Sequence, residues 1–247
     1  MLRTTFFAAL IGLALPAYAF DLNSMSADEK EAFGKAVREY LLENPETIFE
    51  AVEVFRRREA EAEAAADLNL VAANADAIFN DGFSYVGGNP EGDITVVEFL
   101  DYRCGYCKRA HADVEKLIET DGNIRFIVKE FPVLGEASEM ASAFAVAVKQ
   151  LHGDEAYKAT HDTLLTFNGD INEKTLRRLA TILGHDDQAI LDQMNQKSVM
   201  KEIAETRLLA ARLQINGTPT FIFDDELVRG AVSLDIMKSM VAAKRPD

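Results

Sequence analysis

The two cysteines of the chain, Cys104 and Cys107, are separated only by Gly105 and Tyr106. Two thiols at this spacing can form a structural disulfide, bind a soft metal ion or act as a reversible redox couple. A structural disulfide stabilises a protein mainly by closing a long loop of the unfolded chain, and this pair encloses only two residues. The spacing therefore disfavours a structural disulfide and leaves redox chemistry or metal binding.

A redox couple needs one reactive thiol and a second thiol that resolves the mixed disulfide. Residues 104–119 predict a helix with apolar side chains on one side, so Cys104 opens that helix. The helix N-terminus stabilises a thiolate, and Arg103 and Lys108 add positive charge nearby. Cys104 is therefore the expected nucleophile, and Cys107, one turn further along, is the expected resolving thiol.

An acidic residue in the preceding apolar segment could take part in the proton transfer. Glu98 lies between the apolar Val97 and Phe99 in a predicted buried strand. Burial there would raise the pKa of its carboxyl group and let it accept the Cys107 proton near neutral pH. The alternative is an exposed Glu98 that faces solvent, which the alternation of a strand permits. Asp101, nearer the end of the strand, is expected to be exposed.

Metal binding is the alternative from another class of function. Two thiolates three residues apart suit Cu(I), and His111 lies four residues after Cys107 on the same helical face. A structural zinc site needs four ligands, and the sequence shows no second Cys/His pair. His111 is expected on the helix surface, and His152, His161 and His185 are expected as surface or capping residues. No cofactor and no resident metal are expected, with Cu(I) on the two thiols as the open alternative.

The elements around the cysteines predict an α/β domain. Short strands are expected in residues 84–88, 93–102 and 123–133, so that residues 94–133 form a strand–helix–strand unit with the cysteines at its first junction. Helices follow from residue 136 to about 213, and then strands at 220–223 and 227–229 and a helix at 233–240.

The segment before this domain is helical in pattern. A helix is predicted over residues 26–44, where Ser26 and Glu29 can form a capping box, and Asn44 is a good cap for a second helix. Each helix has one apolar face, whereas residues 56–67 lack large apolar side chains and predict a solvated helical linker. Short isolated helices are marginal in water. The two helices should therefore either fold back on their own domain or pair with copies of themselves.

The first 19 residues have the features of a cleaved secretory signal peptide. Arg3 precedes an apolar run over residues 6–15, and Ala17-Tyr18-Ala19 offers small residues at a cleavage site. The apolar run is too short to span a bilayer, which takes about 20 residues. We therefore expect cleavage after about Ala19 and export to the periplasm, where disulfides form and persist.

Composition limits the partners. Hydrophobic residues make up 48% and charged residues 27% of the 247 residues, which predicts a folded domain. The net charge of −15 repels phosphate backbones, so nucleic acid is not expected as a partner.

Three features together resemble the thioredoxin fold: Glu98 before the first cysteine, the CxxC motif at the start of a helix, and Thr218-Pro219 before a later strand. The resemblance extends from about residue 83 to the C-terminus, and the long helical block between its halves is similar to the DsbA subgroup. It implies a cis bond between Thr218 and Pro219, packed against the CxxC motif. It also implies that Thr218 pairs with substrate through its main chain, beside Gly105 and Tyr106.

The residues that vary within this family resemble its isomerase branch. DsbA oxidases carry Pro-His between their cysteines and a hydrophobic residue before the cis proline, whereas this chain has Gly105-Tyr106 and Thr218, as DsbC-type isomerases do. Together with the leader and the N-terminal helices, these motifs are most similar to ScsC (suppressor of copper sensitivity) proteins, some of which are trimerised by their N-terminal helices.

The expected protein is thus an α/β thioredoxin fold with an inserted helical domain, preceded by an N-terminal helical oligomerisation stalk. The expected segments are a signal peptide (1–19), a helical stalk and linker (20–80) and a thioredoxin-like domain (81–247) with its insertion at about 136–205. The resemblance implies an exported, homo-oligomeric disulfide isomerase, with a trimer favoured. Its implied partners are misfolded or reduced exported proteins and a membrane thiol reductase. The alternatives are a monomeric DsbA-like dithiol oxidase and a Cu(I)-binding copper-tolerance protein.

Overall fold

The computed structural model describes residues 25–245, and the chain divides into two units between Arg58 and Glu59. The leader expected over residues 1–19 lies outside the described residues. In the part that is described, every helix is too short or too polar to cross a lipid bilayer.

The first unit consists of helix α1 (Ala27–Glu43) and the beginning of helix α2 (Glu46–Ala73). The predicted capping box is present, because the Ser26 hydroxyl accepts from the Glu29 amide at 3.3 Å and the Glu29 carboxylate accepts from the Ser26 amide at 2.8 Å. Asn44 does not cap α2 as expected. Its side-chain amide instead donates to the Tyr40 carbonyl at 2.9 Å and completes the last turn of α1.

The apolar faces of these two helices are exposed in the single chain. Helix α1 has no buried residue. We call the following exposed side chains the N-terminal apolar stripe: Phe33, Val37 and Tyr40 of α1, and Ile48, Val52 and Phe55 of α2. Exposed hydrophobic side chains at helical spacing are typical of a surface that contacts a partner.

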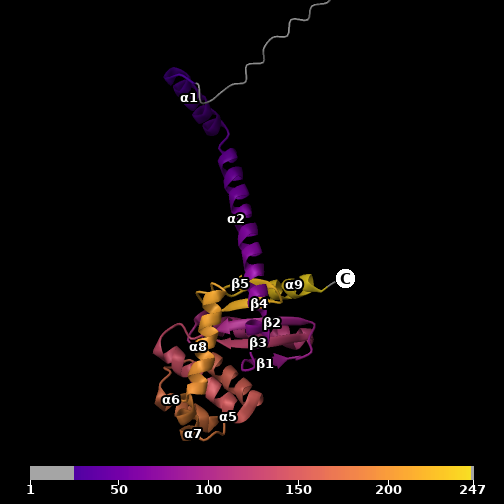
Figure 1. Cartoon of the computed structure of the whole chain (residues 1–247), viewed down its shortest axis with the longest axis vertical. Helices are drawn as coiled ribbons and strands as arrows, with labels where there is room; N and C mark the ends of the chain where they lie inside the picture. The colour runs from indigo at the N-terminus through magenta and orange to yellow at the C-terminus, as the bar shows by residue number, and fades with distance from the viewer. Residues whose placement is uncertain (1–24, 246–247) are drawn as a thin grey trace, which may run out of the picture. The chain divides into compact units, whose positions relative to one another are not determined.

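The second unit contains one mixed β-sheet with the strand order β1-β3-β2-β4-β5 (Figure 1). The strands are β1 (Tyr85–Gly88), β2 (Ile94–Leu100), β3 (Ile124–Glu130), β4 (Thr220–Phe223) and β5 (Glu226–Arg229). Strands β2 and β3 are parallel and the other pairs are antiparallel. The parallel pair needs a crossover connection, which helix α4 (Gly105–Asp121) provides. The strands expected from the sequence are all present.

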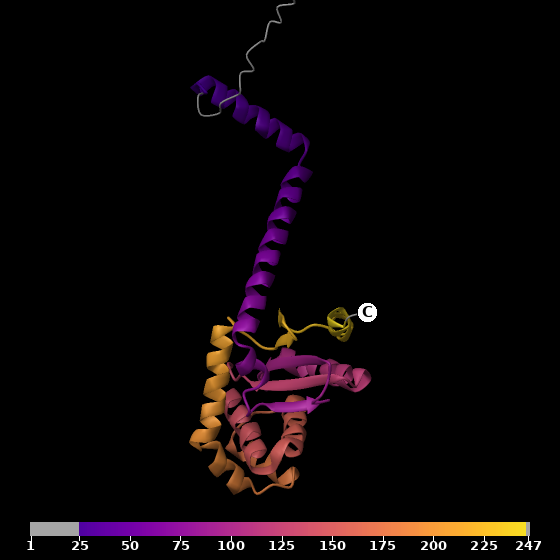
Figure 2. The same cartoon turned by 45° about the vertical axis from the view of Figure 1, so that its right-hand side comes forward.

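Helices cover both faces of the sheet. Successive side chains of β2 point to opposite faces, and apolar side chains are buried on each. Its Val96 and Leu100 face a core shared with α4, α5 and α9, whereas Val97 and Phe99 face a smaller core with α3 and the ends of α2 and α8. Figures 1 and 2 show helices on the two sides of the sheet. The bounds are α3 (Ala75–Phe79), α5 (Glu136–Thr166), α6 (Glu173–Ile182), α7 (Asp187–Met194), α8 (Lys197–Arg212) and α9 (Leu234–Lys244).

The helical insertion comprises α5 to α8 and ends at Arg212, a few residues later than the expected boundary at 205. Gly153 interrupts α5 with a left-handed φ of 82°, a conformation that glycine adopts without steric cost. Alternating small and large buried side chains, among them Ala141 and Phe144, pack α5 against the larger core.

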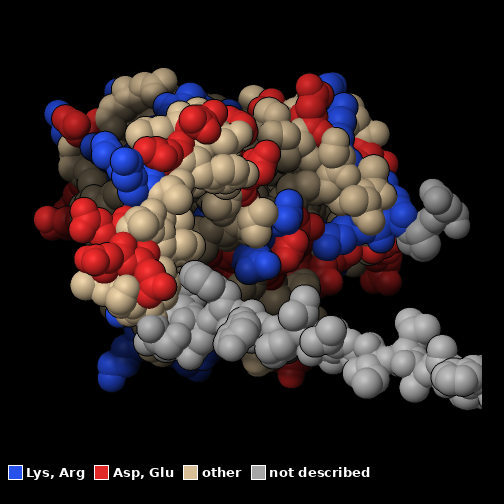
Figure 3. Space-filling model, turned by 90° about the horizontal axis from the view of Figure 1, so that it is seen from above, with Lys and Arg blue, Asp and Glu red and all other residues tan. Residues whose placement is uncertain are grey.

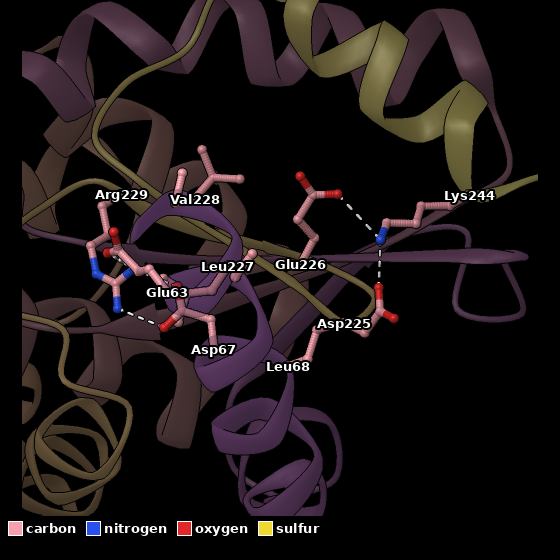
Figure 4. A pocket seen from close by; sticks show the side chains of 11 residues that line it. Glu63, Asp67, Leu68, Asp225, Glu226, Leu227, Val228, Arg229 and Lys244 are labelled. Carbon is pink, nitrogen blue, oxygen red and sulfur yellow. Dashed lines mark hydrogen bonds and ion pairs between the residues drawn. The ribbon is translucent and has the colours of Figure 1, made fainter. Parts of the chain in front are cut away.

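Helix α2 belongs to the second unit from Glu59 onward, and residues 56–66 are exposed as the sequence predicts, whereas Asp67, at the end of that segment, is buried. Val71 is buried in the smaller core, and Asp67 is buried beneath β5. The Arg229 guanidinium donates to both carboxylate oxygens of Asp67, at 2.6 and 2.8 Å (Figure 4). A charged residue at a buried helical position escaped the prediction because its partner lies 162 residues away. The division between the two units, after Arg58, falls within the segment 20–80 that is expected as stalk and linker.

Charged side chains of both signs share the surface. Acidic and basic residues lie side by side over the face that Figure 3 presents. Close to α2, Lys244 pairs with Asp225 at 2.5 Å and with Glu226 at 3.2 Å (Figure 4). These pairs join α9 to the β4–β5 turn.

Candidate functional site

The two cysteines lie where strand β2 passes into helix α4. Cys104 is the N-cap of α4, and Cys107 lies in the first turn with no exposed surface. Both are free thiols, and Cys104 keeps a small exposed area of 7%. The expected asymmetry between an accessible first thiol and a buried second thiol is therefore present.

The loop before β4 lies against the first thiol. The peptide bond between Thr218 and Pro219 is cis, as the resemblance implied. The Cys104 thiol lies 3.1 Å from the Thr218 carbonyl oxygen, to which it donates. The Pro219 carbonyl accepts from the amide of Gly230 at 2.9 Å, which anchors the loop to the end of β5. Residues separated by 114 positions thus meet at the Cys104 sulfur.

The surroundings of the two thiols shift their pKa values in opposite directions. Burial opposes ionisation of Cys104, but a hydrogen bond with the Thr218 side chain, followed by hydrogen bonds with the amides of Cys107 and Tyr106 and with the Cys107 thiol, lowers its pKa overall. Burial, and then the charge of Glu98, raise the pKa of Cys107 well above its usual range. Cys104 is consequently the thiol that forms a thiolate more readily.

The cations next to the cysteines do not act on the thiol as expected. Arg103 donates to the Gly169 carbonyl at 3.4 Å, and Lys108 donates to the Phe167 carbonyl. Both side chains are directed toward the loop after α5. Hydrogen bonds with Thr218 and with groups at the start of α4, rather than these two charges, account for the lowered pKa of Cys104.

Glu98 is buried beneath the thiols. It is 2% exposed, which overturns the alternative of a solvent-facing strand residue. Because Val97 and Phe99 face the smaller core, the alternation of β2 places Glu98 on the face that α4 and Cys107 cover. Burial, then the charges of Glu115 and Cys104, raise the pKa of Glu98 to about 8. Its Oε1 atom is buried and has no hydrogen-bond partner among the residues that the structure describes.

Asp101 is buried, whereas the sequence predicts it to be exposed. Its carboxylate accepts from the amide of Arg103 at 2.7 Å and from the amides of Val133 and Leu134 at 2.8 and 3.0 Å. Asp101 thereby ties the loop after β3 to the segment that leads into the CxxC motif. An aspartate side chain often accepts a hydrogen bond from the backbone amide two residues later, so the bond to the Arg103 amide could have been predicted from the sequence.

Exposed apolar side chains lie on this side of the domain. Tyr106 is 61% exposed, and the Arg109 guanidinium lies 4.3 Å from its ring centroid. Val133 and Leu134, held by Asp101, are 42% and 56% exposed. Gly105 is exposed between the cysteines. Such a surface can contact apolar segments of an unfolded polypeptide.

A buried cluster of polar side chains, which was not predicted from the sequence, joins the sheet to the helical insertion. The Glu130 carboxylate accepts from the hydroxyls of Tyr102 and Tyr157 at 2.7 and 2.6 Å. Burial raises the pKa of Glu130 to about 7, although these hydrogen bonds act in the opposite direction. Tyr102 lies two residues before Cys104, so the group supports the approach to the thiols.

His161 and His111 are more buried than the sequence predicts, whereas His152 and His185 lie near the surface as expected. His161 is 1% exposed, because it falls on the buried side of α5, and His111 is half-buried against α5. Among residues 25–245, the potential metal ligands that cluster in threes are His111, His161 and Asp162, without a cysteine. His111 is therefore not a third ligand beside the thiols. His152 and His185 stack at 4.3 Å between ring centroids near the surface.

Comparison with known families gives two matches. Residues 95–242 match the DSBA-like thioredoxin domain, and residues 29–62 match the copper resistance protein ScsC N-terminal domain. The first match covers more than half of the chain and includes both cysteines and the cis proline.

Several solved structures of thiol oxidoreductases are similar to this chain, and they cover between 69% and 90% of it. A thioredoxin-like oxidoreductase from Silicibacter pomeroyi is 40% identical, with 69% of this chain and 98% of that chain covered and a TM-score of 0.65. The thiol-disulfide exchange protein alpha-DsbA2 from Wolbachia pipientis is 30% identical, with 74% and 98% covered and a TM-score of 0.69. A linker-deletion mutant of Proteus mirabilis ScsC is 25% identical, with 90% and 98% covered and a TM-score of 0.68.

The chain also resembles part of some larger proteins. It spans about a quarter of the length of the curated Na(+)/H(+) antiporters that it matches, at 26–27% identity. The similarity to those proteins is therefore restricted to one portion of each.

Proposed function

Because the chain belongs to the DSBA-like thioredoxin family and is a thiol-disulfide oxidoreductase of the DsbA/ScsC type, we propose that it acts as a disulfide isomerase on exported proteins. The observation that carries the proposal is the site at the start of α4. It combines a thiol of lowered pKa, Cys104, with a buried thiol, Cys107, and a buried carboxyl group, Glu98.

The first chemical step uses the Cys104 thiolate. It attacks one sulfur of a substrate disulfide, a bond forms between the two sulfurs, and the other substrate sulfur leaves as a thiolate. In isomerisation, a substrate thiolate then attacks the sulfur bonded to Cys104 and releases the Cys104 thiolate. The substrate ends with a different disulfide, and no electrons are gained or lost.

A second route releases a substrate that does not rearrange. The Cys107 thiol passes its proton to the Glu98 carboxylate and attacks the Cys104 sulfur, so that the substrate leaves as a thiolate and the pair becomes a disulfide. Two electrons have then moved to the substrate. A membrane thiol reductase is the partner that we propose for returning the pair to the dithiol.

The loop with the cis proline supplies the substrate contact. Thr218 and Pro219 lie beside the Cys104 sulfur, and an extended substrate segment would pair with the main chain of Thr218. Tyr106 and Gly105, which are exposed between the cysteines, would contact the same segment. The proposed clients are misfolded or reduced exported proteins.

Self-association is part of the proposal. The N-terminal apolar stripe is exposed among residues 25–245, and it lies within the match to the ScsC N-terminal domain. We propose a homo-oligomer, with a trimer favoured, in which several thiol pairs act on one client and raise the local concentration of reactive thiols. Export is proposed from the expected leader, and a similar solved structure is a periplasmic thioredoxin-like protein from Salmonella enterica serovar Typhimurium.

The test is the recovery of activity from scrambled ribonuclease by the reduced protein. We expect recovery with the intact protein, strong loss with Cys104→Ser, and a trapped mixed disulfide with Cys107→Ser. Val52→Glu, which places a charge in the N-terminal apolar stripe, should lower the isomerase rate while leaving the thiols reactive. Failure to recover ribonuclease, together with fast oxidation of reduced ribonuclease by the disulfide form, would identify a DsbA-like oxidase instead.

A further inference from the structure

Three potential metal ligands converge where α4 faces α5. His111 lies on α4, and His161 and Asp162 lie on α5. One ligand atom from each lies within 4.8 Å of the others, and His111 Nε2 is 3.4 Å from Asp162 Oδ1. A tetrahedral ion with ligands at about 2.1 Å keeps its ligand atoms about 3.4 Å apart. One of the three separations thus already fits, and the other two are no longer than 4.8 Å.

A hydrogen bond orients the buried His161 imidazole, as is usual for histidines that bind a metal ion. His161 Nδ1 lies 3.2 Å from the Tyr102 hydroxyl, which donates to Glu130 at 2.7 Å. Histidine ligands typically use one ring nitrogen for the metal and the other for a hydrogen bond that orients the ring. Because Nδ1 is occupied in this way, Nε2 is the nitrogen left for an ion. This second contact distinguishes His161 from a histidine buried only by packing.

A cation already lies at the carboxylate. The Lys158 ammonium is 2.7 Å from both oxygens of Asp162 and 2.9 Å from Glu115 Oε2. An ion at His111 and His161 must compete with this ammonium for Asp162. Displacement of Lys158 would also release the Glu115 carboxylate, which could then complete the coordination together with water.

We propose that His111, His161 and Asp162 bind a divalent transition-metal ion of the zinc class and so fasten α4 to α5. Two imidazoles and one carboxylate suit Zn²⁺ and similar ions, whereas Cu(I) prefers thiolates and Ca²⁺ requires six or more oxygens. The site does not use the thiols. Since α4 begins at Cys104, the ion would tether the helix that carries the redox pair to the helical insertion.

The experiment is a calorimetric titration of the full chain with ZnCl₂. The background is the double variant Cys104→Ser and Cys107→Ser, which removes the thiols as competing ligands. We expect one ion per chain, and at least tenfold weaker binding in both His111→Gln and Asp162→Asn. Lys158→Met should strengthen binding about tenfold, because it removes the competing ammonium. The matched control is His185→Gln in the stacked surface pair, which should bind as the background does.

Zn²⁺ binding by Tyr102→Phe separates a metal-binding role of the histidines from a purely structural one. It removes the hydroxyl that orients His161 while keeping the ring, and should weaken Zn²⁺ binding about tenfold. Circular dichroism of each variant separates lost binding from lost folding. Binding that is unchanged in the folded His111→Gln and Asp162→Asn variants, or lost in His185→Gln, would overturn the site. Weaker binding in folded Lys158→Met would equally contradict it.

Discussion

Glu98 changes charge in the pH range where thiol-disulfide exchange is fast, and this makes stability depend on pH. Its folded pKa of about 8 lies above the ordinary value of 4.5. Between these values the folded state keeps a proton that the unfolded state gives up, so the free energy of unfolding falls as pH rises. Above pH 8 the folded protein carries a buried carboxylate with one unpaired oxygen.

Replacement of this carboxyl group should therefore stabilise the protein at high pH. We expect Glu98→Gln to raise the free energy of unfolding by about 2–4 kcal/mol at pH 9 and to leave it nearly unchanged at pH 5. Urea unfolding at the two pH values measures the difference. Glu155→Gln, at an exposed position of α5, is the control and should show no such dependence. Equal effects of Glu98→Gln at pH 5 and pH 9 would contradict the raised pKa.

The two thiols should differ in reactivity because their pKa values move apart. We expect iodoacetamide to alkylate Cys104 at pH 7 at least tenfold faster than an ordinary cysteine thiol, and to leave Cys107 unmodified until the protein unfolds. Mass spectrometry of peptides from timed samples measures both rates. Comparable labelling of the two residues in the folded protein would show that Cys107 is accessible and that the proposed division of roles is wrong.

At the residue scale, the burial of some site residues could be predicted from the sequence, and the burial of others could not. The burial of Glu98 was predictable, because it interrupts an apolar strand. The burial of Asp101 was not predicted, since two of its partners, Val133 and Leu134, lie 32 and 33 residues away and reach it only after the parallel strands pair. His161 was misjudged for a similar reason, because its buried side is defined by α4.

At the scale of elements, periodicity predicted the strands and the crossover helix well. Their order in the sheet required long-range pairing: β4 lies beside β2, although more than 100 residues separate them. The low apolar content of residues 56–67 predicted a solvated segment, and residues 56–66 are exposed. Asp67, at the end of the segment, departs from the prediction because its ion pair with Arg229 attaches it to the sheet domain.

This attachment can be tested with two acidic residues one helical turn apart. Asp67 is 10% exposed at its side chain and bonded to Arg229 through both oxygens, whereas Glu63 is 66% exposed and lies 3.3 Å from the same guanidinium. We expect Asp67→Ala to lower the free energy of unfolding by about 1–2 kcal/mol, and Glu63→Ala to change it by less than about 0.5 kcal/mol. Urea denaturation measures both. A larger loss with Glu63→Ala would show that the buried pair is not the main attachment.

At the scale of the whole molecule, the chain joins a sheet domain with a hydrophobic core to an N-terminal unit whose described residues, 25–58, form none. The larger core is closed by α4, α5 and α9 within the second unit. The N-terminal unit buries no side chain of α1. Two helices with an exposed apolar face do not remain stable alone in water, so the free energy for ordering them must come from another surface.

The proposed second surface is the same stripe on another copy of the chain. Ile48→Glu places a charge in the N-terminal apolar stripe, and we expect it to shift the protein from an oligomer toward a single chain in sedimentation equilibrium. Arg57→Glu is the matched control, because residue 57 lies on the opposite side of α2 from Ile48, at nine residues and 100° each. It should leave the oligomer intact. A wild-type protein that sediments as a single chain at all concentrations would refute self-association, and equal disruption by both variants would show that charge, rather than the apolar stripe, governs it.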